Sequence, residues 1–80
     1  MSDNIRAEIA AERERQLAKG YTPEHDDEHG AAILAEFASE YIGRAIRHGN
    51  RSDLIKAAAL LESATASLDR LLSFDGVRHG

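Results

Sequence analysis

Apolar residues recur every three or four positions in three stretches of the chain, and each stretch is bounded by residues that start or end helices. The first stretch predicts a helix over residues 3–19, capped by Ser2 or Asp3 and ended by Gly20. Its apolar positions are Ile5, Ile9, Ala10 and Leu17. Because these positions share one face, the charged residues from Glu12 to Arg15 are expected to face water.

The second stretch predicts a helix over residues 31–48 with a wider apolar surface. One stripe consists of Ile33, Leu34, Phe37, Tyr41 and Ala45, and Ala38, Ile42 and Ile46 widen it. Gly49-Asn50 is expected to end this helix. The two aromatic residues of the stripe lie one turn apart on the core face, which favours core packing over a stacking platform.

The third stretch predicts a helix over residues 53–73, capped by Ser52. Its main apolar positions alternate by four and three residues, as in the seam of a coiled coil. The seam positions are Leu54, Ala58, Leu61, Thr65, Leu68 and Leu72, and Ala57, Leu60, Ala64 and Leu71 thicken it. Residues 74–80 are interpreted as a frayed tail, and residues 21–30 as an acidic turn.

These elements predict an all-α fold: one domain over residues 1–80, built from a long antiparallel helical hairpin and an N-terminal helix. The N-terminal helix packs across this hairpin or across a partner. The alanine-rich faces present more apolar surface than one hairpin covers, so we expect a homodimer or a higher oligomer. A monomeric three-helix bundle is the alternative.

Charge is unevenly distributed along the 80 residues, although the net charge is only −4. Residues 21–40 carry six acids and no Lys or Arg, whereas residues 41–60 carry four bases and one acid. The acidic balance argues against direct nucleic-acid binding, which depends on Lys and Arg. The chain has no cysteine, no apolar run long enough for a membrane span and no cationic signal segment, so it is interpreted as a cytoplasmic protein.

The segment from Glu24 to His29 is the candidate for chemistry, because it contains four carboxylates and two imidazoles. His25 and His29 are four residues apart, so they would share a helical face and could hold a metal ion with a neighbouring acid. A solvated acidic turn stabilised by the helix dipole is the simpler interpretation. No metal and no cofactor are therefore expected, and no serine sits in a recognisable nucleophile turn.

An enzymatic alternative uses the same segment. In small helical nucleotide pyrophosphohydrolases, carboxylates one helical turn apart hold magnesium, and Asp27 or Glu28 with Glu36 and Glu40 could imitate one such set. The facing helix offers only widely spaced acids, and no catalytic residue is assigned. The alternative is a small metal-dependent nucleotide-processing enzyme, or its remnant, that uses residues 24–29.

Partner binding is the leading interpretation, because a one-sided acidic surface can occupy a basic groove built for phosphates. The candidate contact residues are Tyr21, Glu24, Asp26, Asp27, Glu28, Glu36 and Glu40. Tyr21 could either pack onto the following helix or serve as an exposed anchor.

The chain also resembles a family of small bacteriophage and prophage proteins. The resemblance rests on residues 11–16 (AERERQ), 19–29 (KGYTPEHDDEH), 51–60 (RSDLIKAAAL) and 68–70 (LDR), and it covers about residues 5–71. This chain replaces the family's Gly-Glu-Leu with residues 30–34 and lacks a Trp- and Pro-containing connection at residues 47–52. The family has no settled activity.

Small acidic phage proteins without catalytic residues often inhibit host defence. The resemblance therefore implies a non-enzymatic inhibitor of a host defence complex, most concretely an anti-CRISPR protein that blocks a DNA-binding surface in the bacterial cytoplasm. A plain oligomerisation module is a third interpretation.

Overall fold

A computed structural model describes residues 2–74, which form four helices. These are α1 (Ser2–Ala18), α2 (Pro23–His29), α3 (Ala31–His48) and α4 (Arg51–Phe74). No strand occurs between residues 2 and 74, so the all-α prediction is confirmed. The prediction of three helices is wrong, because the segment expected to be an acidic turn contains α2. The predicted tail, apart from its first residue Phe74, lies outside the described residues.

Glycine and asparagine set the ends of the long helices. Gly49 adopts the left-handed conformation (φ 64°), and its N–H donates to the Ala45 carbonyl at 2.7 Å, as expected for a helix C-cap. The predicted Ser52 cap is wrong, since α4 already begins at Arg51. Instead, Asn50 Oδ1 accepts from the Ser52 N–H at 3.1 Å and from the Ser52 hydroxyl at 2.8 Å. The carboxamide of Asn50 caps α4, because its oxygen can reach a free N–H group in the first turn of the helix.

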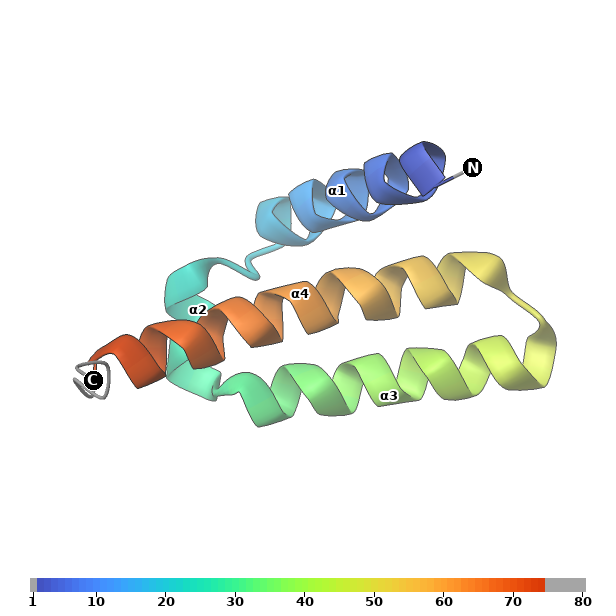
Figure 1. The fold of residues 1–80 in the computed structure, drawn as a ribbon. Coiled ribbons are helices and arrows are strands. Elements are labelled where there is room, and N and C mark those ends of the chain that lie inside the picture. The colour runs from blue at the N-terminus through green and yellow to red at the C-terminus, as the bar shows by residue number, and fades with distance from the viewer. Residues whose placement is uncertain (1, 75–80) are drawn as a thin grey trace.

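Helices α3 and α4 form the long antiparallel hairpin, joined by the short connection at residues 49–50 (Figure 1). The core between them is small and contains two leucines among alanines. Its buried members are Leu34, Ala38, Ala57, Leu60 and Ala64. Alanine side chains let the two helix backbones approach closely, so the hairpin is compact but buries little apolar volume.

The predicted leucine seam of α4 does not face α3. Leu60 is 2% exposed, whereas Leu61 is 44% exposed. Three of the positions expected only to thicken the seam, Ala57, Leu60 and Ala64, are the ones that pack against α3. The seam leucines Leu54, Leu61, Leu68 and Leu72 remain on the surface, and so does the fourth thickening position, Leu71. A heptad pattern identifies an apolar stripe, but the alanine stripe beside it permits a closer helix contact. The seam assignment is therefore wrong within one chain.

Helix α4 lies between α1 and α3 (Figure 1), and α1 contacts α4 but not α3. The described helices therefore form an open layer and do not close into a three-helix bundle. The short α2 contacts both α3 and α4, and it brings the chain from the end of α1 to the start of α3. Over the described residues, no helix is both long and apolar enough to cross a membrane.

Candidate partner-binding site

Helix α2 forms where the acidic segment follows a strong start signal. Thr22 has an extended backbone, and its hydroxyl oxygen accepts a hydrogen bond from the His25 N–H at 3.2 Å. Pro23 occupies the first turn, where its missing N–H is not needed. Gly30, at φ 90°, ends the helix and donates its N–H to the Asp26 carbonyl at 2.8 Å. The result is one short helix that carries all the acids of residues 24–28.

Asp26 does not lie on the acidic surface. It is only 3% exposed, so the expectation that it contacts a partner is wrong. Within the described part of the chain, its side chain pairs with His25, whose Nδ1 lies 3.3 Å from Asp26 Oδ1. When Nδ1 carries the proton, the imidazole donates to this buried carboxylate. Asp26 faces inward because the short helix packs against both α3 and α4 and buries one side.

Asp27 holds α2 against α4. Arg70 donates from Nη2 to Asp27 Oδ1 at 2.8 Å and from Nε to Oδ2 at 3.0 Å, and the Ser67 hydroxyl donates to Oδ1 at 2.8 Å. These bonds hold the pKa of Asp27 below its usual value, with Arg70 the larger cause and Ser67 the second. The same bond raises the pKa of Arg70. Asp27 is therefore engaged within the chain and presents little free charge to a partner.

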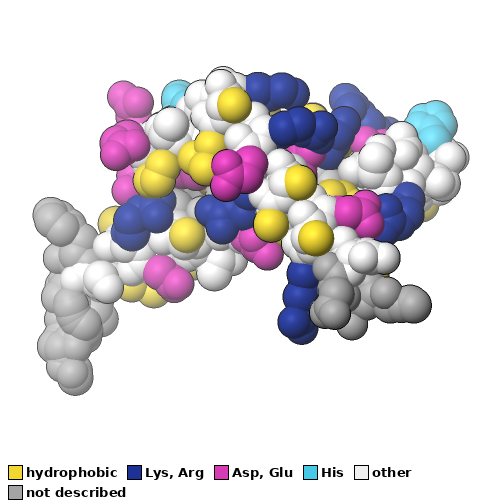
Figure 2. Space-filling view, turned by 90° about the horizontal axis from the view of Figure 1, so that it is seen from above, with side chains coloured by type: hydrophobic (Ala, Val, Ile, Leu, Met, Phe, Trp, Pro, Cys, Tyr) yellow, Lys and Arg dark blue, Asp and Glu magenta, His cyan; other side chains and the backbone are white. Residues whose placement is uncertain are grey.

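Besides Asp27, which is exposed but paired, four of the predicted contact residues are exposed. These are Glu24, Glu28, Glu36 and Glu40. None of the four forms a hydrogen bond or an ion pair with another residue of the described part of the chain. Figure 2 shows a group of acidic side chains at the upper left of the molecule, with basic side chains below it and a mixture of acidic and basic side chains over the rest of this face. We call the four glutamates the acidic end.

Tyr21 is not a free anchor. Its half-buried ring packs against the core formed by α3 and α4 and meets the His25 ring edge-on, with centroids 5.1 Å apart. Of the two expectations for Tyr21, the structure therefore shows the packed one. The His25 and His29 rings lie 4.4 Å apart, as their spacing predicts. Among the residues that the structure describes, no three His, Cys, Asp or Glu side chains gather to hold a metal ion.

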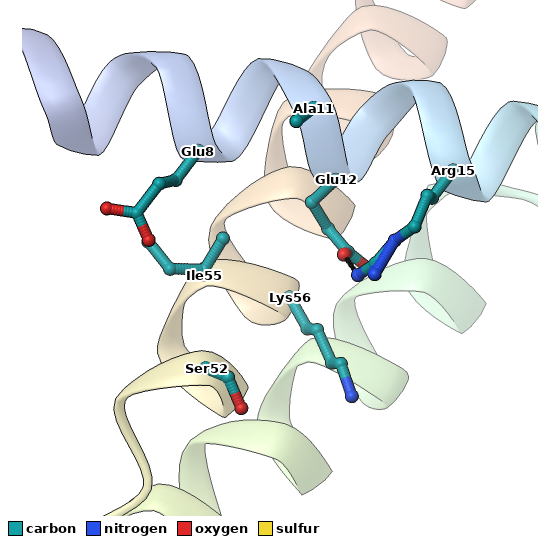
Figure 3. A pocket seen from close by; sticks show the side chains of 7 residues that line it. All are labelled: Glu8, Ala11, Glu12, Arg15, Ser52, Ile55 and Lys56. Carbon is teal, nitrogen blue, oxygen red and sulfur yellow. Dashed lines mark ion pairs between the residues drawn. The ribbon is translucent and has the colours of Figure 1, made fainter.

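A polar contact between α1 and α4 was not expected from the sequence. Glu12 and Gln16 are each 6% exposed, and Gln16 Nε2 donates to Glu12 Oε2 at 3.0 Å, so the expectation that Glu12 faces water is wrong. Glu12 also pairs with Arg15. Figure 3 shows Glu12 and Arg15 of α1 meeting near Lys56 of α4, and Glu8 of α1 beside Ile55 of α4. These residues line an open pocket of about 310 Å³.

Helix α1 is held at its N-terminal half by a bidentate ion pair. Arg51 donates to Glu8 from Nη1 at 2.6 Å and from Nη2 at 2.7 Å, which lowers the pKa of Glu8. Of the predicted apolar face of α1, Ile5, Ala10 and Leu17 are exposed and only Ile9 is half-buried. The hydrogen bonds and ion pairs that dock the helix come from carboxylates and an amide, a contact that no apolar periodicity signals. Its pairs join residues about forty positions apart in the chain.

Comparisons with known proteins identify no relative: no family model, no curated protein and no solved structure matches the chain.

Proposed function

We propose that this chain is a non-enzymatic phage or prophage protein that binds and inhibits a host defence complex through its acidic end. The observation behind the proposal is that Glu24, Glu28, Glu36 and Glu40 are exposed and unpaired within the described chain. The phage origin rests on the resemblance of residues 11–29 to that family. The most concrete target is a CRISPR complex whose basic groove holds DNA.

The charge pattern supports this mode of binding. Glu36 and Glu40 are four residues apart on α3, so they lie on one side of the helix about one turn apart. Spaced carboxylates on a rigid helix can meet Lys and Arg side chains that otherwise hold phosphates, and complementary charge speeds the encounter. The Asp27–Arg70 pair fixes α2 on α4, which keeps Glu24 and Glu28 in place for such a contact.

Two of the acids first considered are outside the proposed contact. Asp26 is buried, and Asp27 is already bound to Arg70 and Ser67. Reversing either charge would disturb the packing of α2 before it tested any partner. The proposal also includes a homodimer or higher oligomer in the bacterial cytoplasm, without direct binding to nucleic acid. The nucleotide-processing alternative has no specific observation in its favour.

A pull-down from host lysate containing CRISPR effector complexes tests the proposal. The test variant is Glu28→Lys/Glu36→Lys. The control is Glu14→Lys/Glu62→Lys, which changes net charge equally at exposed glutamates on α1 and α4. Glu62 pairs with Arg13 at 3.6 Å between exposed side chains, a contact of little energetic value.

Stoichiometric recovery of a DNA-binding complex by wild type and control, with loss in the test variant, is the expected result. Circular dichroism must show equal helicity in all three proteins. Equal recovery by a folded test variant would show that the acidic end is not the contact.

A further inference from the structure

One apolar face of the α3–α4 hairpin has no partner in the described chain. We call it the leucine face; it consists of Leu54, Leu61, Leu68 and Leu72 of α4 and Ile42 and Ile46 of α3, and each of the six is exposed by more than a third. Exposed aliphatic side chains scattered singly are ordinary on a monomer, but a continuous stripe marks an interaction surface.

Contacts within the hairpin place the two rows on the same side. Tyr41 of α3 and Lys56 of α4 meet on one side of the hairpin, where the ammonium lies 5.6 Å from the ring centroid. Leu54 is two residues from Lys56, about 200° around α4, and Ile42 is one residue from Tyr41, about 100° around α3. Both are therefore turned away from the Tyr41–Lys56 side.

The leucine face has a projection at one end and a hollow at the other. Ile46, near the connection between α3 and α4, is 78% exposed, more than any other large apolar side chain of the described chain. At the opposite end a hollow of about 660 Å³ is lined by Ala31, Ala32, Leu68 and Leu71, with Asp27 and Arg70 among its polar residues. Small alanines create the hollow where α3 begins.

Charge is also opposite at the two ends. The end with Ile46 carries Arg44 and Arg47, whereas α2, beside the hollow, carries Glu24 and Glu28. Two hairpins stacked in parallel would bring like charges together. An antiparallel arrangement places the basic end of one chain beside the acidic end of the other, which is favourable.

We propose that the leucine face binds a second copy of this chain. The two copies are related by a two-fold axis, their α4 helices run antiparallel, and Ile46 of each copy enters the hollow of the other. A two-fold interface must be self-complementary, and a projection and a hollow at opposite ends of one face satisfy that requirement. The six side chains expose on the order of 500 Å² of apolar surface, and Leu71 with the alanines of the hollow extends it toward the roughly 800 Å² per partner of a stable interface.

This dimer places Glu24 and Glu28 near the basic end of the other copy but leaves Glu40 of the acidic end free. Glu40 is two residues from Ile42, about 200° around α3, so it lies nearly opposite the leucine face. A monomeric wild type would therefore overturn the dimer without deciding whether the chain inhibits a host complex, and loss of inhibition would not decide whether the chain dimerises.

The test uses two full-length variants with complementary defects. Ile46→Glu removes the projection and places a carboxylate where the isoleucine would pack against Ala31, Ala32 and Leu68. Ala32→Lys fills the hollow and makes it basic. Sedimentation equilibrium and native mass spectrometry measure the state of each variant alone and of an equimolar mixture. Ile5→Lys, at an exposed isoleucine on α1, is the matched control.

Wild type and Ile5→Lys are expected to dimerise, while each interface variant alone weakens dimerisation by about 100-fold or more. In the mixture, the carboxylate introduced by Ile46→Glu meets the ammonium introduced by Ala32→Lys on the other chain. The remaining contact is the native one, so a one-to-one heterodimer re-forms. Helicity by circular dichroism shows that each variant folds. A monomeric wild type, or a dimer that both variants leave intact, overturns the proposal, and so does a mixture of folded variants that stays monomeric.

Discussion

Arg70 forms a bidentate ion pair with Asp27, in which Nη2 donates to Oδ1 at 2.8 Å and Nε donates to Oδ2 at 3.0 Å. The two residues are 43 positions apart in the sequence. The pair joins the short helix α2 to the last turns of α4. Ser67, one turn before Arg70, adds its hydroxyl at 2.8 Å. A seven-residue helix is too short to be stable alone, so these contacts and the burial of Asp26 decide whether α2 forms.

The Asp27–Arg70 pair predicts a specific loss of stability in acid. The pKa of Asp27 is lowered in the folded protein, chiefly by its bonds to Arg70 and then Ser67. The stabilisation is therefore present above the unfolded carboxyl pKa of about 3.9 and is lost as the pH falls through the lower folded value. Wild type should melt at a higher temperature than Asp27→Asn at neutral pH, and the difference should shrink below about pH 4.

Glu40→Gln, at an unpaired glutamate, is the control. A difference independent of pH would contradict the assignment.

The same charge reversal should have a large effect on stability at Asp26 and a small one at Glu28. Asp26 is 3% exposed, so Asp26→Lys forces an ammonium into a packed site and should cost about 3–5 kcal/mol. Glu28 is exposed, so Glu28→Lys should change the free energy of unfolding by no more than about 0.5 kcal/mol. Urea denaturation followed by circular dichroism measures both. Equal effects would mean that Asp26 is not buried in solution.

Several parts of this fold follow from local signals. Gly20 and Gly49 lie just beyond the predicted helix ends and both have positive φ, and the Thr22-Pro23 start signal gives the cap of α2. Gly30 follows the acidic segment so closely that the sequence predicts a turn there. A single glycine, however, is enough to end α2 while α3 begins at the next residue.

The parts that could not be predicted depend on contacts between distant residues. Helical periodicity places Leu60 and Leu61 on neighbouring faces, but it does not state which face meets α3. The burial of Asp26 and the pairing of Asp27 with Arg70 depend on where α2 docks, and no spacing rule connects those residues. Likewise, the buried Glu12 and Gln16 lie on a face of α1 that looks solvent-exposed by polarity alone.

Adjacent leucines test which stripe of α4 packs against α3. Leu60 is 2% exposed, so Leu60→Ala should cost about 2–5 kcal/mol by leaving a cavity in a small core. Leu61 is 44% exposed, so Leu61→Ala should cost about 1 kcal/mol or less in the monomer. Denaturation at low protein concentration isolates this comparison. At high concentration Leu61→Ala should become more harmful, because the proposed dimer buries Leu61. The reverse order at low concentration would restore the heptad positions as the core.

Two glycines of the same hairpin predict opposite effects of alanine. Gly49 adopts φ 64° at the end of α3, where an L side chain is strained, so Gly49→Ala should destabilise the protein by about 1 kcal/mol. Gly43 lies inside α3, and a Cβ there would meet only the Arg47 side chain, at 3.2 Å from Nη1. A flexible guanidinium can move aside, so Gly43→Ala should stabilise by about 0.5–1 kcal/mol through the helix propensity of alanine. Thermal and urea unfolding measure the sign of the stability change in each variant.

Destabilisation by Gly43→Ala would show that Arg47 is held where it lies. A neutral Gly49→Ala would mean that the connection between α3 and α4 accepts another backbone conformation.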